Sequence, residues 1–375
     1  MKSDNNLFHE AILPNPAVKS WKEKGNKVIG TICCHVPEEL IHAAGMLPYR
    51  VRATGSTDDS QGEVWLSQLS CNFCRSCMQY VADGTYDFLD GMASSDGCLI
   101  AQRLYDSWRY SGERNFTHLV TVPRMSTDAA VSWYREELVK FKEGLENFTG
   151  NVITDDKLVK SIEIYNETRR LIRELYDLRK SESPIITGTQ TQKLILAAMS
   201  MPKDQYNELL QKYLEEIKHD EPITDSQARL MVVGSGIDDP NFIKMIEDRG
   251  GLVVTDVHCF GSRYMWEPVE VEGDVLTSLA SSYLKRSTCP RMMDQHQKLF
   301  DLVKNMVDKF KVDGVIYAHM RYCDMWGGEN VIFEKRFKEA KIPVLALERE
   351  EIMTNELQQA VRVEAFIEML QGEGI

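Results

Sequence analysis

The sequence predicts an α/β protein with two doubly wound parallel sheets and a helical insertion in its first half. Short apolar runs alternate with longer amphipathic stretches along most of the 375 residues, an order typical of strand–helix–strand units. Several runs are rich in Val and Ile without polar alternation, which indicates strands buried on both faces of a sheet. Residues from about 133 to 218 show helical periodicity alone.

The individual elements follow from these patterns. The helix predicted at 38–45 begins after Pro37, a favourable first-turn residue, and the helix at 155–180 carries an apolar stripe. The predicted strands are residues 27–34, 88–94, 117–122, 229–234, 252–257, 314–318 and 343–347. The other predicted helices are residues 189–200, 204–218, 241–249, 292–310, 329–340 and 355–370.

The polar stretch at 219–226 is the best candidate for a linker, because clean strand–helix alternation resumes after it. We therefore predict an N-terminal α/β domain at 1–218, which contains the insertion at about 133–218. A C-terminal doubly wound domain is predicted at 228–375.

Composition narrows the class of protein. The net charge of -13 argues against nucleic acid or an anionic membrane surface as the main partner, because both require a basic footprint. The polar N-terminus resembles no signal peptide, and no apolar run reaches the ~18 residues of a membrane span. We expect a cytoplasmic protein, in which nine cysteines are metal ligands, reactive thiols or packing residues rather than disulfides.

Four predicted strands each have a cysteine at or just beyond their carboxyl end. These are Cys34 (with its neighbour Cys33), Cys98, Cys259 and Cys323. Ligands of open α/β sheets bind outside the carboxyl ends of the strands, so these thiols are expected to converge. Because adjacent residues of a strand point to opposite faces, either Cys33 or Cys34 should be a core residue.

Two further features concern metal binding. Cys34 and Cys289 each precede a predicted helix start, where free N–H groups stabilise a thiolate. Cys71, Cys74 and Cys77 have the CxxCxxC spacing of ferredoxin-type sites, with Cys98 as a possible fourth ligand. The alternative is one ligand with two packing neighbours. Zinc is a weaker alternative, since no second CxxC or HxxxH pair accompanies the run.

At these cysteines the chain resembles the family of 2-hydroxyacyl-CoA dehydratases and class I, ATP-dependent benzoyl-CoA reductases, with the related double-cubane cluster proteins. The resemblance covers nearly the whole chain. The matching segments are residues 34–48 (CHVPEELIHAAGMLP), 69–77 (LSCNFCRSC), 86–108, 256–264 (DVHCFGSRY), 281–290 (SSYLKRSTCP), 312–324 (VDGVIYAHMRYCD), 342–350 and 362–370.

The resemblance implies two flavodoxin-like domains with an iron–sulfur cluster in the cleft between them. Carried over, its three recurrent ligands fall on Cys71, Cys98 and Cys323, which would hold a [4Fe-4S] cluster. Possible further ligands are Cys34, Cys259 and Cys289. The resulting six cysteines match the number that a double-cubane [8Fe-9S] cluster would need.

The implied chemistry is low-potential electron transfer to an acyl-CoA in anaerobic metabolism. The implied partners are a homologous sister subunit, in a heterodimer or heterotetramer, or a second copy in a homodimer, and a separate ATP-hydrolysing activator. This chain has no GxxxxGK[ST] motif of its own. The form of the first segment, with Cys259 and Cys289, favours benzoyl-CoA ring reduction in aromatic degradation.

Several alternatives remain. They are a 2-hydroxyacyl-CoA dehydratase subunit that removes water through a ketyl radical, a double-cubane reductase of small molecules, a non-catalytic electron-relay subunit, and a zinc-stabilised binding protein. The sequence singles out no catalytic side chain.

The sequence also suggests roles for several other charged and small residues. Arg50, Arg52 and Arg321 are either surface charge or contacts to CoA phosphates. Glu38 and Glu39 complement a helix dipole. The segment 234–236 (GSG) is a turn between a strand and a helix rather than a nucleotide site, because the third glycine of that motif is missing.

Overall fold

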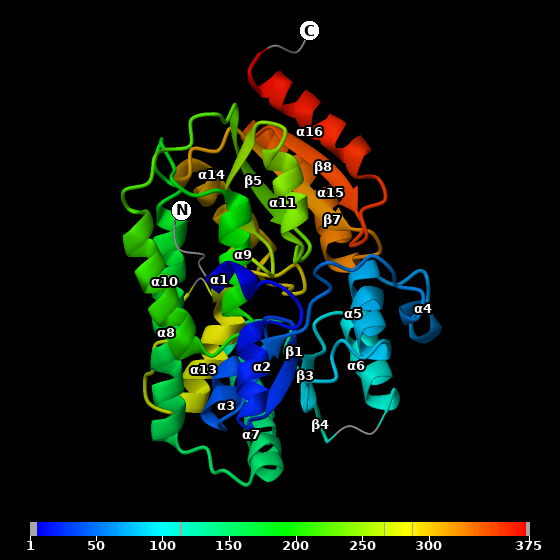
Figure 1. Ribbon diagram of the computed structural model, residues 1–375, viewed down its shortest axis with the longest axis vertical. Coiled ribbons are helices and arrows are strands. Elements are labelled where there is room, and N and C mark those ends of the chain that lie inside the picture. Colours follow the sequence, from blue (N-terminus) through cyan, green and yellow to red (C-terminus); the bar gives the residue numbers. More distant parts are fainter. Residues whose placement is uncertain (1–5, 113–114, 266, 287, 373–375) are drawn as a thin grey trace.

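The computed structural model describes residues 6–112, 115–265, 267–286 and 288–372 and contains two four-stranded parallel sheets (Figure 1). The first has the order β2-β1-β3-β4 and the second β6-β5-β7-β8. Their strands are β1 (Val28–Ile32), β2 (Leu47–Arg50), β3 (Gly91–Ser95), β4 (Phe116–Val120), β5 (Ala228–Gly234), β6 (Gly251–Val257), β7 (Gly314–Met320) and β8 (Val344–Arg349).

The two sheets have the same topology. In each sheet the second strand in chain order is an edge strand beside the first, and the third strand pairs with the other side of the first. This order is that of flavodoxin-like folds, so the predicted fold class is confirmed. All predicted strands are present, but β2 was missed. It has four residues including Pro48, whose missing N–H weakens a strand signal and suits an edge position.

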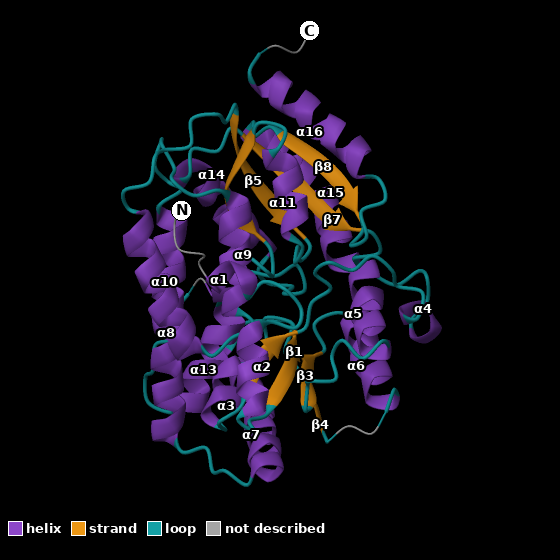
Figure 2. Cartoon of the chain, viewed as in Figure 1, coloured by secondary structure: helices purple, strands orange, loops and turns teal. Residues whose placement is uncertain are grey.

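Helices flank both sheets, and loops occupy the region between them (Figure 2). Several were not assigned from the sequence, among them α5, α6 and α13. In α5 the apolar residues Cys74, Cys77, Met78 and Val81 are buried at helical spacing, and the polar Asn72, Arg75 and Gln79 are buried beside them. The helices are α1 (Asn6–His9), α2 (Pro16–Glu23), α3 (Glu38–Ala43), α4 (Gly62–Trp65), α5 (Asn72–Ala82), α6 (Leu99–Tyr110), α7 (Asp128–Thr149), α8 (Asp155–Asp177), α9 (Gly188–Ala198), α10 (Lys203–Ile217), α11 (Pro240–Glu247), α12 (Ser262–Met265), α13 (Val275–Lys285), α14 (His296–Lys309), α15 (Asp324–Ala340) and α16 (Glu356–Leu370).

The hydrophobic cores join segments from both halves of the chain. Leu194 and Ile195 of α9 share a core with Met231 of β5 and Val254 of β6. In the other direction, α13 follows β6 in sequence but packs against α7 and α8, and its Leu279 shares a core with Ile29 of β1. Each half therefore contributes a helix to the other. The domain limits at 218 and 228 stay a prediction.

Among the described residues, no helix has both the length and the hydrophobicity that crossing a bilayer requires.

A buried polar network holds this arrangement together at the start of α3. Arg169 of α8 forms an ion pair with Glu39, and both side chains are fully buried. Tyr283 of α13 donates to Glu39 over 2.6 Å, and Tyr264 of α12 donates to Glu38 over 2.6 Å. Dipole complementation is therefore not the main role of these glutamates. They connect one N-terminal helix to the insertion and to the C-terminal half.

Replacing Arg169 by Met should lower the free energy of unfolding by about 3–5 kcal/mol, because Glu39 would remain buried without its cation. The measurement is urea-induced unfolding in the absence of oxygen. Arg170→Met is the matched control: its guanidinium is half exposed and pairs with Glu167 and Glu174, so we expect a loss below ~1 kcal/mol. Equal losses of unfolding free energy in the two variants would show that the buried ion pair stabilises the fold no more than the exposed pairs do.

Candidate functional site

The carboxyl ends of the two sheets face each other across the middle of the molecule, as the arrowheads of Figure 2 show. Loops that follow strands of one sheet touch loops that follow strands of the other. Cys34, after β1, donates from Sγ to the carbonyl of Cys259, after β6, over 3.5 Å. The Thr54 hydroxyl donates to the carbonyl of Asp238, after β5, over 2.6 Å. Ligand sites of such sheets form at this edge.

Three of the predicted ligands, Cys71, Cys98 and Cys323, occupy N-cap positions of helices α5, α6 and α15. The Sγ of Cys98 accepts a hydrogen bond from the amide of Ala101 over 3.3 Å. All three side chains are half-buried. The free N–H groups and the positive end of each helix dipole favour negative charge at these positions.

These three thiols are also electrostatic neighbours. Burial raises the pKa of Cys98 to about 12, and the adjacent Cys71 and Cys323 contribute in the same direction. Burial likewise raises the pKa of Cys323 to about 11, again with a contribution from Cys71. We call Cys71, Cys98 and Cys323 the first cysteine group. Three helices that start far apart in sequence thus bring their first residues to one place.

Cys34, Cys259 and Cys289 form a second cysteine group. A side-chain hydrogen bond between the thiols of Cys34 and Cys259 raises the pKa of Cys259 well above its usual value, with a further contribution from the nearby Cys289. The same hydrogen bond lowers the pKa of Cys34, helped by the positive charges of Arg50 and Arg263. The two groups adjoin, because the nearby Cys289 of the second group also contributes to the raised pKa of Cys323 in the first.

The second group lies among arginines that the sequence did not single out together. The Arg263 guanidinium donates to Cys259 Sγ over 3.1 Å, and Arg286 is another cation near Cys34. Burial lowers the pKa of His35 well below its usual value, and Arg291 is the next contributor. The only sequence signal for Arg263 is its position four residues after a cysteine at a strand end.

Of the remaining cysteines, Cys74 and Cys77 differ from these six, whereas Cys33 is half-buried and is an electrostatic neighbour of Cys34, Cys289 and Cys98. Cys74 and Cys77 are 3% and 0% exposed and pack in a hydrophobic core. The expectation that Cys33 or Cys34 is a core residue of a strand is wrong, because β1 ends at Ile32 and both thiols are half-buried. Cys33 has a left-handed φ of 78°, and its Sγ lies 3.3 Å from Nδ1 of His35.

Within the described part of the chain, no three Cys, His, Asp or Glu side chains converge as ligands of a single metal ion. A cubane differs in that each thiolate binds its own iron atom, so its ligands surround a volume rather than a point. The half-buried thiols of the first group lie at helix N-termini. Their assignment as ligands stays a prediction.

The model of one protein family, described as 2-hydroxyglutaryl-CoA dehydratase, D-component, matches residues 33–370. The chain belongs to this family. The matched range includes both cysteine groups and seven of the strands described above, all but β1 (Val28–Ile32).

Curated relatives match at modest identity. A benzoyl-CoA reductase subunit of Thauera aromatica is 29% identical over 88% of each chain. The (R)-phenyllactyl-CoA dehydratase beta subunit of Clostridium sporogenes is 27% identical over 99% of this chain and 100% of its own length. The beta subunit of (R)-2-hydroxyglutaryl-CoA dehydratase from Acidaminococcus fermentans is 23% identical over 95% of this chain and 96% of its own.

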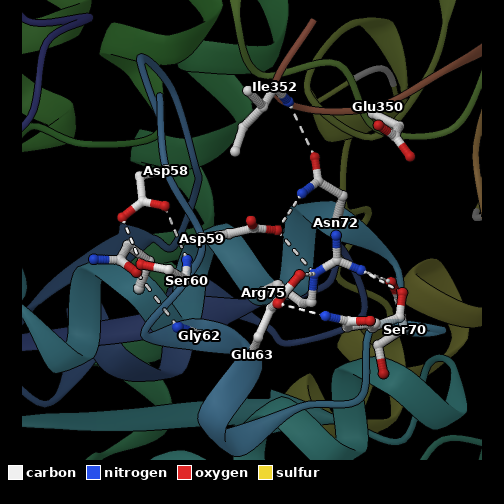
Figure 3. A network of polar contacts seen from close by, with 12 residues as sticks. Asp58, Asp59, Ser60, Gly62, Glu63, Ser70, Asn72, Arg75, Glu350 and Ile352 are labelled. Carbon is white, nitrogen blue, oxygen red and sulfur yellow. Dashed lines mark hydrogen bonds and ion pairs between the residues drawn. The ribbon is translucent and has the colours of Figure 1, made fainter. Parts of the chain in front are cut away.

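In this member of the dehydratase family, two residues between the cysteines of the CxxCxxC run, Asn72 and Arg75, belong to a polar network (Figure 3). Cys71 directly precedes Asn72. Arg75 donates through Nε to Asp59 over 2.8 Å and through Nη1 to the carbonyl of Ser70 over 2.7 Å. Asn72 donates to Asp59 and accepts from the amide of Ile352 over 3.0 Å. The network ties the start of α5 to the loop after β8, and so joins the halves beside Cys71.

The other residues named from the sequence have different places. Arg50 and Arg52 are 3% and 0% exposed, so surface charge is the wrong interpretation for both. Arg52 donates to carbonyls of Ala11 and Leu196, a structural role, whereas Arg50 lies near Cys34. Arg321 is half exposed and pairs with Glu350.

The GSG segment at 234–236 is a close contact between strands. A Cβ on Gly234 would lie 1.8 Å from a carbonyl oxygen of β7, and the Ser235 hydroxyl accepts from the amide of Met320 over 2.9 Å. Ser235 also hydrogen bonds to Cys323, whose pKa it lowers against the larger effect of burial. The segment therefore supports the first cysteine group.

Replacing Asp59 by Ala should loosen the N-terminus of α5, because it removes the carboxylate that Arg75 and Asn72 share. In protein from which metal has been removed, we expect Cys71 to react with a thiol reagent about tenfold faster. Peptide mass spectrometry of the labelled protein gives the rate at each cysteine. Asp58→Ala is the control, since the Asp58 carboxylate accepts from the amide and hydroxyl of Ser60 and, among the described residues, bonds to neither Arg75 nor Asn72. Unchanged labelling of Cys71 in Asp59→Ala would contradict the positioning role.

Proposed function

We propose that this chain is the iron–sulfur subunit of an ATP-dependent acyl-CoA oxidoreductase that transfers low-potential electrons to an aromatic acyl-CoA such as benzoyl-CoA. The observation that carries the proposal is the first cysteine group: three half-buried thiols, each at a helix N-terminus, at the facing edges of two parallel sheets. A bound cluster would supply one-electron chemistry there.

In this proposal Cys71, Cys98 and Cys323 ligate a [4Fe-4S] cluster, in the cleft between the halves. The chain's own contribution is to position and shield it. Ser235 hydrogen bonds to Cys323, and the network of Asp59 and Arg75 holds the segment that begins with Cys71. The second cysteine group favours a further extension, a double cubane, because its three thiols lie together beside the first group and among cations.

The relatives support the substrate class and the assembly. Their names identify subunits of benzoyl-CoA reductase and of 2-hydroxyacyl-CoA dehydratases. We therefore propose that the chain works in an enzyme with a homologous sister subunit, on an acyl-CoA thioester. A separate ATP-hydrolysing activator would deliver the electrons. The second candidate function, removal of water from a 2-hydroxyacyl-CoA, is favoured by the near full-length match to dehydratase beta subunits.

Purified without oxygen, the chain should contain iron and acid-labile sulfide, with an electron paramagnetic resonance signal after reduction. About four irons per chain would support a single cubane, and about eight a double one. Cys98→Ala and Cys323→Ala should each lose most of the iron of the first site. Cys77→Ala is the control, because that thiol is fully buried in a hydrophobic core.

Colourless protein that carries only zinc would refute the iron–sulfur assignment. Iron lost in Cys77→Ala but retained in Cys323→Ala would refute the choice of ligands.

Assembled with its sister subunit, activator, ATP and a low-potential reductant such as dithionite, the chain should convert benzoyl-CoA to a dienoyl-CoA, with uptake of two electrons from the reductant and two protons from water. Product analysis by mass spectrometry distinguishes this ring reduction from dehydration of a 2-hydroxyacyl-CoA, which lowers the substrate mass by one water. Conversion of the hydroxyacyl substrate alone would select the dehydratase alternative. If the sister subunit turns over either substrate without this chain, the chain is an electron-relay or structural subunit.

A further inference from the structure

Two buried carboxyl groups lie next to each other where loops of the two halves meet. Asp238, in the loop after β5, is 0% exposed, and Glu351, in the loop after β8, is 6% exposed. The two side chains are within hydrogen-bonding reach of each other. An ionised carboxylate has acceptors only, so two of them cannot form a hydrogen bond, and their charges repel in a buried site. One of the two groups must therefore hold a proton, or a cation must balance both.

The partners of the pair provide one cation for two carboxyl groups. The Arg349 guanidinium lies 3.3 Å from Glu351 Oε2, and both side chains are buried. Oδ2 of Asp238 accepts from the amide of Ala53, whereas Oδ1 meets no donor among the described residues. A proton on Glu351 would supply that donor. In the described ranges no three Cys, His, Asp or Glu side chains are placed to bind a metal ion here, so the pair suits a proton better than a divalent cation.

The surroundings favour a neutral Glu351. Burial makes the largest contribution that raises its pKa well above the usual value, and the negative charge of Asp238 raises it further. Burial also lowers the pKa of His258 to about 4, so this neighbour is uncharged at neutral pH. The titratable and charged groups that face the pair are Arg349 of β8, Asp239 in the loop after β5, Cys77 and Tyr80 of α5, and His258 after β6. Arg349 is the cation of this set.

The pair has access to solvent. Glu351 lines a pocket of about 530 Å³, to which the loop after β2, α11 and the loop before α16 also contribute. Ser56 and Thr57 border the pocket on the side of the first half, and Lys244 borders it on α11. Water in this pocket can exchange a proton with Glu351, whereas the fully buried Asp238 is not part of the pocket wall.

The pair also lies close to the first cysteine group. Burial raises the pKa of Cys77 well above its usual value, and the charges of the two carboxyl groups add to this effect. A hydrogen bond with Cys74 lowers the pKa of Cys71, and the Arg349 charge contributes in the same direction. Arg349 therefore acts electrostatically on the carboxyl pair and on Cys71 at once.

We propose that Asp238 and Glu351 share one proton, exchanged with water through this pocket, and that this proton sets the charge beside the cluster at Cys71. With the proton, the two carboxyl groups and Arg349 have no net charge, and without it they carry one negative charge. A negative charge opposes the addition of an electron nearby, so loss of the proton lowers the reduction potential. By reciprocity, an added electron favours uptake of a proton from water. The inference rests on the proposed iron–sulfur function and adds a proton site to it.

Infrared difference spectroscopy of the full chain, purified without oxygen, detects the proton in H₂O and D₂O, because the C=O stretch of a protonated carboxyl group lies above the amide I band and shifts on deuteration. We expect such a band at neutral pH. Glu351→Gln should lose it because the protonated group is gone, and Asp238→Asn should lose it because the like charge is gone. Glu350→Gln is the matched control: it changes the next residue, which pairs with Arg321 near the surface, and should keep the band.

A redox titration followed by electron paramagnetic resonance tests the coupling. The reduction potential should fall as the pH rises in the wild type and in Glu350→Gln. In Glu351→Gln it should stay near the value that the wild type has at low pH, because this side chain cannot ionise.

The proposal is overturned if the wild type has no protonated carboxyl band, if the band persists in Glu351→Gln, or if the potential of Glu351→Gln follows the pH as that of the wild type does. The infrared band does not depend on iron. A chain with the band but without iron would refute the iron–sulfur function and the coupling while establishing the proton site, so the two failures are distinguishable.

Discussion

The structure depends on one constraint of parallel sheets: all carboxyl ends of the strands lie at the same edge. Two sheets of identical order face each other with these edges, so the loops after β1, β3, β5, β6 and β7 meet in the middle of the molecule. Parallel strands also require helical crossovers, whose N-termini point to the same edge. Cysteines at helix starts are therefore gathered in one place without any local sequence motif that spans them.

Facing sheets must be kept at a fixed separation, and buried polar contacts between the halves do this. Glu38 and Glu39 accept hydrogen bonds from tyrosines of α12 and α13, while Arg169 of α8 supplies the counter-charge. A second contact between the halves is at the start of α5, where Asn72 accepts a hydrogen bond from the amide of Ile352. Such contacts add little net stability but are strongly directional. They favour one relative placement of the sheets, and with it one distance between the cysteine groups.

The two cysteine groups differ in their surroundings. Burial dominates the pKa of Cys98 and Cys323, whereas Arg50 and Arg263 help to lower the pKa of Cys34. Neither group favours negative charge at every thiol. A hydrogen bond with Cys74 lowers the pKa of Cys71 in the first group, and a hydrogen bond with Cys34 raises the pKa of Cys259 in the second.

The sequence by itself determined the α/β class, seven of the eight strands and the gathering of cysteines at strand ends, because hydrophobic periodicity and chain order are local properties. It did not determine the edge strand β2, which is short and contains Pro48, or α5, in which polar residues are buried beside the apolar ones.

Only the tertiary structure decided how the six cysteines divide into two groups, that Arg50 and Arg52 are buried, and that α13 returns to the first half of the molecule. Each of these depends on contacts between residues more than a hundred positions apart. The free energy of such contacts comes from burial and charge in three dimensions, which leaves no periodic trace along the chain. The cysteines could be named from the sequence, but their partners could not.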